Sequence, residues 1–377
     1  MTYVMELRWT KLSTRANNSF DEVRFILAFI VLVAHTSALA TAEQLDWFTK
    51  YFDANFAVKG FFAISGYLVS KSYLSSDSYF NYFEKRLRRI YPAYILVIIY
   101  CVLIGILTTN LSLFNFISNS HFFKYLIANL AFLNFIQPNL PGSIPFSEVQ
   151  ALNGSLWTIK VELMLYLTVP FLVYLQKKLG TYATLIICFG LGITWYLYFT
   201  QYFNQPIGQT VSRQFPGQLP YFAFGSMLGF ISFNKISNVL VISVCLIYFV
   251  LIKNGIDNPL RELINMLFYP LLVLLIAKSR ILSISIGKYG DLSYGIYLFH
   301  LPTIQLLEHF ELYRFNPYIA FFTSILITMI LATFSWHIVE KRFLKRSSHY
   351  ISATKSAYWV SSLTDKGSQV RIWQNLL

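Results

Sequence analysis

Four ionisable side chains lie within apolar stretches of this 377-residue sequence, namely Arg24, His35, Glu162 and His300. Moving a charged group into hydrocarbon is costly, so an ionisable residue at such a position indicates a function or a specific partner. An imidazole can take a proton from a hydroxyl group near neutral pH, and a carboxylate can orient that imidazole. The residue types therefore predict acid–base chemistry inside a membrane.

Arg24 and His35 are eleven residues apart in one apolar stretch, a spacing that puts both side chains on the same face of a helix. Their axial separation is about 16 Å at 1.5 Å per residue, with Arg24 near the cytoplasmic edge and His35 in the outer half. Glu162 lies about 9 Å below the outer end of its own stretch. We therefore predict that His35 and Glu162 pair as the catalytic residues, with a Glu162–Lys160 contact as the alternative.

Three further residues are predicted to line the same path. Trp157 and Lys160 precede Glu162 in one apolar stretch, and His300 lies close to mid-membrane, just before Pro302. Proline cannot donate to the hydrogen-bond ladder of a helix, so we expect Pro302 to break that ladder locally. For His300, a helix-stabilising role and a pore-lining role both remain open.

A basic segment, residues 83–89, precedes the third apolar stretch. Arg86 and Arg89 are three residues apart, so on a helix both can address one anion. Guanidinium groups suit phosphates, and we predict that Arg86, Arg88 and Arg89, with Arg24 nearby, hold the phosphates of a ligand. The alternatives are a plain positive-inside anchor and contact with anionic lipid.

Small residues, Ser65 and Gly66, fall near the middle of the second apolar stretch. Such residues either allow two helices to approach closely or leave room for a slender ligand, and close packing is the simpler reading. The cysteines Cys101, Cys188 and Cys245 lack the spacing of a zinc site. The sequence therefore predicts no metal centre.

The composition requires that these residues be carried by membrane helices. Hydrophobic residues make up 56% of the chain and charged residues only 12%, about half of what soluble domains carry. We predict an all-α integral membrane protein of about ten transmembrane helices, with stretch 125–136 as a short interfacial or re-entrant segment. The predicted spans are 23–40, 56–74, 90–108, 156–175, 181–199, 219–233, 239–252, 264–277, 291–308 and 318–338.

The basic residues predict the orientation. Ten crossings put most of the 30 Lys and Arg residues on the side of the N-terminus and the C-terminal tail, which the positive-inside rule assigns to the cytoplasm. This distribution accounts for the net charge of +13 without a nucleic-acid partner. We divide the chain into a cytoplasmic N-terminal segment, 1–18, a membrane domain, 19–345, and a polar basic tail, 346–377.

Several motifs, in this order, resemble the membrane-bound acyltransferase family 3 over about residues 19 to 345. The Arg24 to His35 spacing matches the family's Arg-x10-His motif, and Arg86 to Arg89 matches its Arg-x-x-Arg motif. The remaining matches are Phe20-Asp21-Glu22-Val23, Gly60 to Leu68, Ile90-Tyr91-Pro92, Leu156-Trp157 with Val161-Glu162, and Ser293 to His300. Lys160 departs from the small residue that is common before the Glu, and Arg342 stands where Pro is frequent.

The resemblance implies a multi-pass enzyme of the bacterial cell (inner) membrane. It would move an acyl group, commonly acetyl, from cytoplasmic acyl-CoA to a hydroxyl of a cell-envelope sugar such as O-antigen, exopolysaccharide or a lipid-linked precursor. We expect the donor's pantetheine arm to pass Ser65 and Gly66 and His35 to act as general base, a covalent acyl-His intermediate being the alternative. The competing class is a proton-coupled transporter of an envelope glycan or lipid, in which Arg24, His35 and Glu162 form a relay.

Overall fold

The computed structural model describes residues 19–40, 42–144, 151–230, 237–253, 258–279, 281–282 and 286–345. Within these ranges the regular elements are all helices, which confirms the all-α class. The predicted segments 1–18 and 346–377 lie outside the described residues.

A long helix is present at each of the ten predicted spans. They are α2 (Phe20–Leu39), α4 (Ala54–Leu74), α5 (Tyr79–Thr108), α8 (Trp157–Leu179), α9 (Thr181–Tyr202), α11 (Phe215–Phe230), α12 (Asn238–Lys253), α13 (Asn258–Lys278), α14 (Ser293–His309) and α16 (Pro317–Phe334). Shorter helices connect them: η2 (Glu43–Leu45), α3 (Asp46–Tyr51), α6 (Leu113–Ser118), α7 (Ser120–Leu130), η3 (Gly154–Leu156), α10 (Ile207–Ser212), η4 (Ile286–Tyr289), α15 (Leu312–Phe315), the π-helix η5 (Ser335–Glu340) and α17 (Lys341–Phe343).

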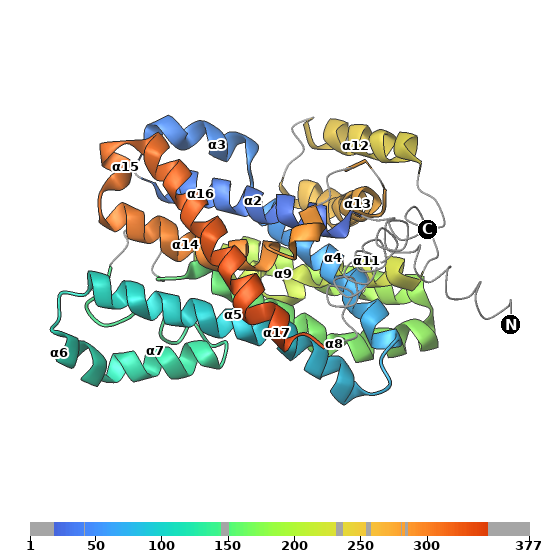
Figure 1. The fold of residues 1–377 in the computed structure, drawn as a ribbon. Coiled ribbons are helices and arrows are strands. Elements are labelled where there is room, and N and C mark those ends of the chain that lie inside the picture. Colours follow the sequence, from blue (N-terminus) through green and yellow to red (C-terminus); the bar gives the residue numbers. More distant parts are fainter. Residues whose placement is uncertain are drawn as a thin grey trace, which may run out of the picture.

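Six of the described helical stretches are long and apolar enough to cross a membrane. They contain α2, α5, α8, α9, α13 and α16, so the structure supports a multi-pass protein but not the full count of ten. Helices α11 and α12 have 16 residues each and α14 has 17, which is at or below the length that a bilayer requires. Helix α7 has 11 residues and lies back along α5 (Figure 1). It spans about 17 Å, so the prediction that this region is too short to cross is confirmed.

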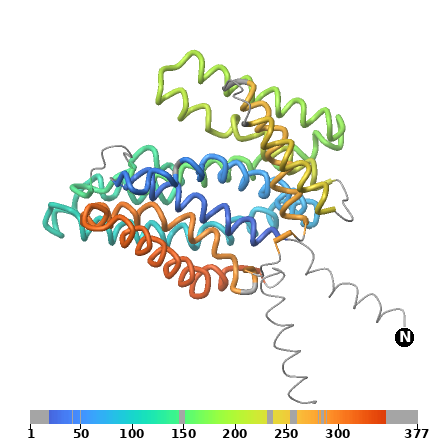
Figure 2. The backbone as a smooth tube through the Cα atoms, turned by 90° about the horizontal axis from the view of Figure 1, so that it is seen from above, coloured from blue at the N-terminus to red at the C-terminus, as the bar shows by residue number. Residues whose placement is uncertain are grey.

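The site-bearing helices pack around α4. Helix α4 contacts α2, α8, α11 and α13, and α2 also packs against α14. In Figure 2 the yellow-green segment containing α9 lies along one side of the molecule, and the orange-to-red helices α14 and α16 lie on the other. Helix α4 thus stands between two halves of the molecule, one formed by α9, α11 and α13 and the other by α2 and α14.

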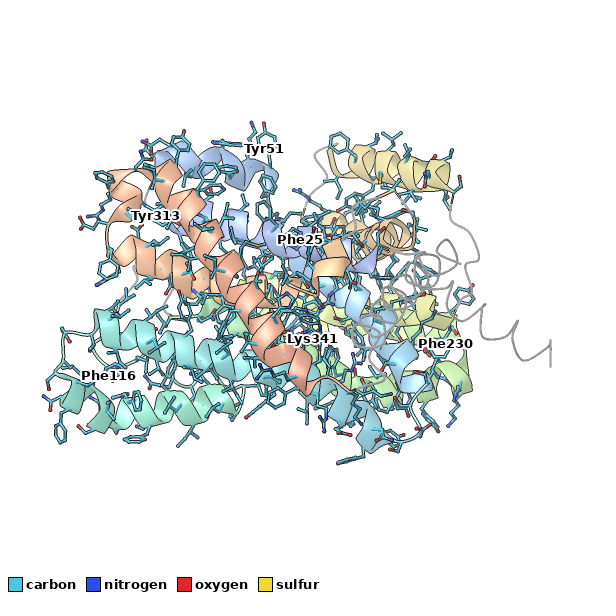
Figure 3. The ribbon with its side chains drawn as sticks, in the orientation of Figure 1. Phe25, Tyr51, Phe116, Phe230, Tyr313 and Lys341 are labelled. Atoms are coloured by element: carbon cyan, nitrogen blue, oxygen red, sulfur yellow. The ribbon has the colours of Figure 1, made fainter. Side chains whose placement is uncertain are left out.

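Large apolar side chains cover the outer faces of the helices. Figure 3 shows them along the exterior, with Tyr51, which is 70% exposed, labelled at one edge of the molecule. Phe114, Phe315 and Ile127 are among the most exposed, at 79%, 82% and 70%. A surface of this kind is unfavourable in water and favourable against lipid, which agrees with the membrane location.

Candidate active site

The two histidines predicted from the sequence lie together. The Nδ1 atom of His35 on α2 is 2.8 Å from Nε2 of His300 on α14, and the planes of the two rings are nearly parallel, with an interplanar angle of 7°. His300 is fully buried, at 0% exposure, whereas His35 keeps part of its surface accessible. We call these two residues the His pair.

The hydrogen bonds of the His pair define which nitrogen of His35 is basic. The Nδ1 atom of His300 is 3.2 Å from the carbonyl oxygen of Ile296, one turn back on α14. A carbonyl oxygen only accepts, so this Nδ1 carries the proton and Nε2 of a neutral His300 is an acceptor. His35 must then donate through its own Nδ1, which leaves the lone pair of His35 Nε2 free. The pair therefore holds His35 in the tautomer that a general base requires.

The predicted pairing of His35 with Glu162 is wrong in this structure. The Oε1 atom of Glu162 accepts hydrogen bonds from the hydroxyl of Ser65, at 2.9 Å, and from the hydroxyl of Tyr166. The alternative contact with Lys160 is not formed either, because the ammonium group of Lys160 lies over the ring of Phe135, 4.7 Å from its centroid.

The α2–α4 packing explains why Glu162 and His35 do not meet. Phe20 stacks on Tyr67, and the backbone at Gly60 faces Leu27, so the two helices run antiparallel in a fixed register. On that register Ser65, which binds Glu162, lies close to the level of Arg24. The eleven residues from Arg24 to His35 then separate the carboxylate from the imidazole by about 16 Å along the helix axis.

The position at which α8 starts explains why the predicted depth of Glu162 in the membrane was incorrect. We expected this helix to begin at the outer surface, but the residues that lead into it, Asn153, Ser155 and Leu156, are 3%, 2% and 1% exposed. The side-chain amide of Asn153 donates to the carbonyl oxygen of Leu298 at 3.0 Å. This carbonyl is free because Pro302, four residues later, has no N–H to offer it. Pro302 therefore breaks the ladder as predicted, and the gap anchors the buried start of α8.

A cluster of four charged residues joins α2 and α5 to the residues just before α14 and to the end of the π-helix η5. The carboxylate of Asp291 binds the guanidinium groups of both Arg24 and Arg89, the latter at 2.5 Å, and Arg89 also binds Glu340 at 2.5 Å. The two carboxylates are 1% exposed and the two arginines 21% and 16%. Among the described residues this ion cluster pairs two arginines with two carboxylates, so two of the four arginines predicted to hold phosphates already have carboxylate partners within the protein.

Aromatic rings and a π-helix shape the ion cluster. The Arg89 guanidinium lies between the rings of Tyr294 and Trp336, 5.3 and 5.5 Å from their centroids. Trp336 and Glu340 belong to the π-helix η5, a rare conformation that recurs at functional positions. Gly290 has φ +106°, and a Cβ there would lie 1.9 Å from the indole nitrogen of Trp336. Only glycine fits at this position.

The remaining two arginines differ from each other. Arg88 is exposed and pairs with Glu84 one turn away, at 2.7 Å. Arg86 is half-buried, donates to the hydroxyl of Ser72 at 3.2 Å, and has a buried Nε without a hydrogen-bond partner in the described part of the chain. No carboxylate among the described residues forms an ion pair with it. Arg86 is thus the predicted phosphate ligand whose charge is least compensated.

Gly66 and Trp157, two other residues predicted to belong to the site, lie in two different environments. A Cβ at Gly66 would lie 2.0 Å from the backbone oxygen of Phe222, so this glycine serves the close packing of α4 on α11. The close packing expected for Gly66 is therefore present, and a place for Gly66 along the donor's path stays a prediction. Trp157 lines a pocket on the far side of α4 from the His pair.

Sequence reasoning missed three partners. Asp291 and Glu340 lie at the ends of apolar stretches, where a charged residue is ordinary, and nothing in the chain links either to an arginine 200 or more residues away. Tyr166 was not singled out, because it is one of 26 tyrosines in the chain. Its position four residues after Glu162 was the available signal, because i and i+4 side chains meet on a helix.

Comparison of the sequence with known proteins identifies the family to which this chain belongs. The sequence model of a family described as "Acyltransferase domain" matches residues 17–337, which is most of the chain. The chain therefore belongs to this acyltransferase family, and it is an acyltransferase enzyme.

Two curated proteins are similar over nearly the whole length. An O-acetyl transferase of Shigella phage Sf6 is 28% identical over 346 residues, which covers 89% of this chain and 98% of the relative. Nodulation protein 10 of Rhizobium leguminosarum bv. viciae is 24% identical over 384 aligned positions, with 88% and 95% coverage. No solved structure matches the chain.

Proposed function

We propose that this enzyme transfers an acyl group, acetyl in the first instance, from acyl-CoA to a hydroxyl group of a cell-envelope sugar. The observation that carries the proposal is the His pair, which leaves a free lone pair on His35 Nε2. The similarity to a phage protein named O-acetyl transferase supports an oxygen acceptor and an acetyl group.

The donor's phosphates bind at the basic end of the molecule, the end that holds Arg24, Arg86, Arg88 and Arg89. Arg86 is the principal ligand, because its guanidinium has an unused buried Nε and no carboxylate partner among the described residues. Arg88 adds an exposed cation beside it, and the ion cluster holds the surrounding helices in place rather than the ligand. This end faces the cytoplasm, where acyl-CoA is available, and both termini lie on that side.

Glu162 and Ser65 lie between Arg86, which binds Ser72 further along α4, and the His pair. The carboxylate of Glu162 accepts bonds from two hydroxyl groups and forms no ion pair within the described residues. We assign to it a place along the donor's path, where it orients the amide groups of the pantetheine arm. Glu162 is therefore a positioning residue in this proposal and does not act on His35.

The transfer step follows from the tautomer of His35. Nε2 of His35 takes the proton of the acceptor hydroxyl while the acceptor oxygen attacks the thioester carbonyl. The carbon–sulfur bond then breaks, and the imidazolium returns its proton to the departing thiolate. The products are the O-acylated sugar and free CoA. His300 accepts the Nδ1–H bond throughout and stabilises the imidazolium that forms transiently, as the orienting partner of a catalytic histidine does.

The test compares envelope glycans of cells that carry the wild-type gene, a deletion, or His35→Ala. We expect an O-acyl ester that is present with the wild-type gene and absent in both other strains, with equal amounts of membrane-inserted protein. Purified wild-type protein should release CoA only when acceptor glycan is present. An ester that persists with His35→Ala would remove His35 from the mechanism. Glycan movement that depends on a proton gradient and needs no acyl-CoA would support the transporter instead.

A further inference from the structure

A polar pocket opens at the end of the molecule opposite the basic end. Its volume is about 480 Å³, within the ~300–1,000 Å³ of small-ligand sites. The pocket lies between the N-terminal part of α4, the start of α8, the end of α9, α10 with its flanking loops, the start of α11 and the N-terminal part of α13. From Asp53 at its mouth to Ser72, which binds Arg86, α4 extends for 19 residues, or about 28 Å. That distance is close to the thickness of a bilayer core.

The floor of the pocket is a network of polar groups that already form hydrogen bonds with one another. Lys59 binds both carboxylate oxygens of Glu262, at 2.6 and 2.9 Å, and the hydroxyl of Tyr221 binds the same carboxylate at 2.6 Å. Asn265 donates to this carboxylate at 3.4 Å. Because these buried charges neutralise each other, the floor is rigid and carries no net charge to attract a simple ion.

The walls, by contrast, carry unused hydrogen-bonding groups. Gln201, Gln205 and Gln209 line the pocket, are exposed, and form no side-chain hydrogen bond to any described residue. Gln218 also lines it and is only 4% exposed; its amide nitrogen donates to the backbone of Arg213, while its Oε1 has no partner in the described part of the chain. A buried acceptor without a partner is costly and indicates a donor that arrives with a ligand.

Aromatic rings complete the lining. Trp157 and Tyr196 both line the pocket. A ligand that pairs with several amides and also packs on aromatic rings must present hydroxyl groups at its edge and C–H groups on its faces. A pyranose ring has this combination. Two exposed arginines at the mouth, Arg213 and Arg261, form no ion pair among the described residues and suit a phosphate or carboxylate carried by the glycan.

The pocket lies at the depth of the His pair. The α2–α4 register places His35 level with the first residues of α4, where the mouth of the pocket lies. At the other end Trp157 is followed by Thr158, whose hydroxyl is 2.7 Å from that of Tyr297, and the ring of Tyr297 lies 5.8 Å from the ring of His300. Thr158 and Tyr297 thus lie between the pocket and the His pair, and their contacts link the two.

We propose that this polar pocket binds the saccharide acceptor, and that Trp157, Gln201, Gln209 and Gln218 select a sugar ring there. The inference rests on the proposed function for the reaction, and it adds the acceptor's binding site and its approach from the face opposite to acyl-CoA. The glutamine amides bind the ring hydroxyl groups, and the aromatic rings pack against its faces.

The experiment uses full-length protein in lipid nanodiscs with acetyl-CoA and alkali-de-O-acetylated envelope polysaccharide from the source strain. The double variant Gln201→Ala/Gln209→Ala should raise the KM for the polysaccharide about tenfold or more, because two hydrogen bonds are lost, and leave the KM for acetyl-CoA within about twofold. Trp157→Ala should do the same. The matched control is Tyr202→Ala/Gln214→Ala, which changes neighbouring residues that do not line the pocket and should leave both KM values unchanged.

A second measurement separates this inference from the reaction itself. Binding of the polysaccharide is measured without donor, in a His35→Ala background, by thermophoresis. Binding that is lost in the glutamine double variant and kept in the control supports the pocket even if no acetyl transfer is found. Transfer in the wild type with an unchanged polysaccharide KM in the double variant overturns the pocket while the proposed reaction stands.

Discussion

The hydrogen bond between His35 and His300 gives the most specific prediction. Replacing His300 with Leu removes the acceptor of the His35 Nδ1–H while keeping an apolar side chain in a position that is 0% exposed. His35 then has a buried donor without a partner and no longer favours one tautomer. We expect kcat to fall while the KM for acyl-CoA stays unchanged, because His300 is remote from the basic end.

The size of the effect follows from one buried hydrogen bond. Leaving a buried donor unsatisfied costs about 1–3 kcal/mol, and each 1.36 kcal/mol is tenfold in rate. The predicted loss in kcat is therefore about 5- to 150-fold. His35→Ala removes the base itself and should cost about 10²–10⁴-fold. The double variant should be no slower than His35→Ala, since an orienting residue has no effect without the group that it orients.

The assay is the release of CoA in the presence of acceptor glycan, with purified protein of matched thermal stability. His300→Gln provides the control, because its side-chain oxygen can still accept from His35 Nδ1 and should restore most of kcat relative to His300→Leu. A His300→Leu enzyme with wild-type kcat would refute the tautomer argument. So would a glutamine variant that is as slow as the leucine variant at equal stability.

Three other variants test the supporting structure. Arg86→Ala should raise the KM for acyl-CoA with little effect on kcat, because it removes a cation that binds the donor equally in the ground and transition states; an unchanged KM in a donor titration would exclude it as phosphate ligand. Asp291→Ala should lower stability by about 3–5 kcal/mol, since Arg24 and Arg89 each lose a buried carboxylate partner, although Arg89 keeps Glu340. Thermal unfolding in detergent measures this, and a wild-type transition would contradict it. Gly66→Ala places a methyl group 2.0 Å from the oxygen of Phe222 and should lower the free energy of unfolding by about 1–3 kcal/mol. Size-exclusion chromatography should then show less folded protein. A normal yield and unfolding temperature would show that α4 and α11 can move apart.

The helices and many of the site residues could be predicted from the sequence, because both depend on local patterns. Ten apolar stretches predict ten long helices, and the eleven-residue spacing of Arg24 and His35 places both on α2 in this structure. In the part of the chain that the structure describes, six helical stretches satisfy the requirements of a membrane span, since α11, α12 and α14 are short and α4 is interrupted by polar residues. An apolar stretch can therefore predict a helix correctly without showing that this helix spans the bilayer.

The pairing of the site residues could not be predicted, because it depends on depth. Glu162 was expected beside His35 on the assumption that its helix starts at the surface. The buried turn at Asn153–Leu156 shifts α8 along its axis, and the carboxylate ends beside Ser65 instead. Likewise, Arg89 was assigned to a ligand because its carboxylate partners, Asp291 and Glu340, lie more than 200 residues further along the chain.

The bond from Asn153 to Leu298 has a consequence for biogenesis. The amide reaches a carbonyl oxygen that the ribosome delivers 145 residues later. Until α14 is inserted, the side-chain amide of Asn153 has no protein partner at its final depth, and lipid offers none. The N-terminal half of the chain must therefore keep this turn hydrated while translation continues, and the arrival of α14 allows it to be drawn into the bundle.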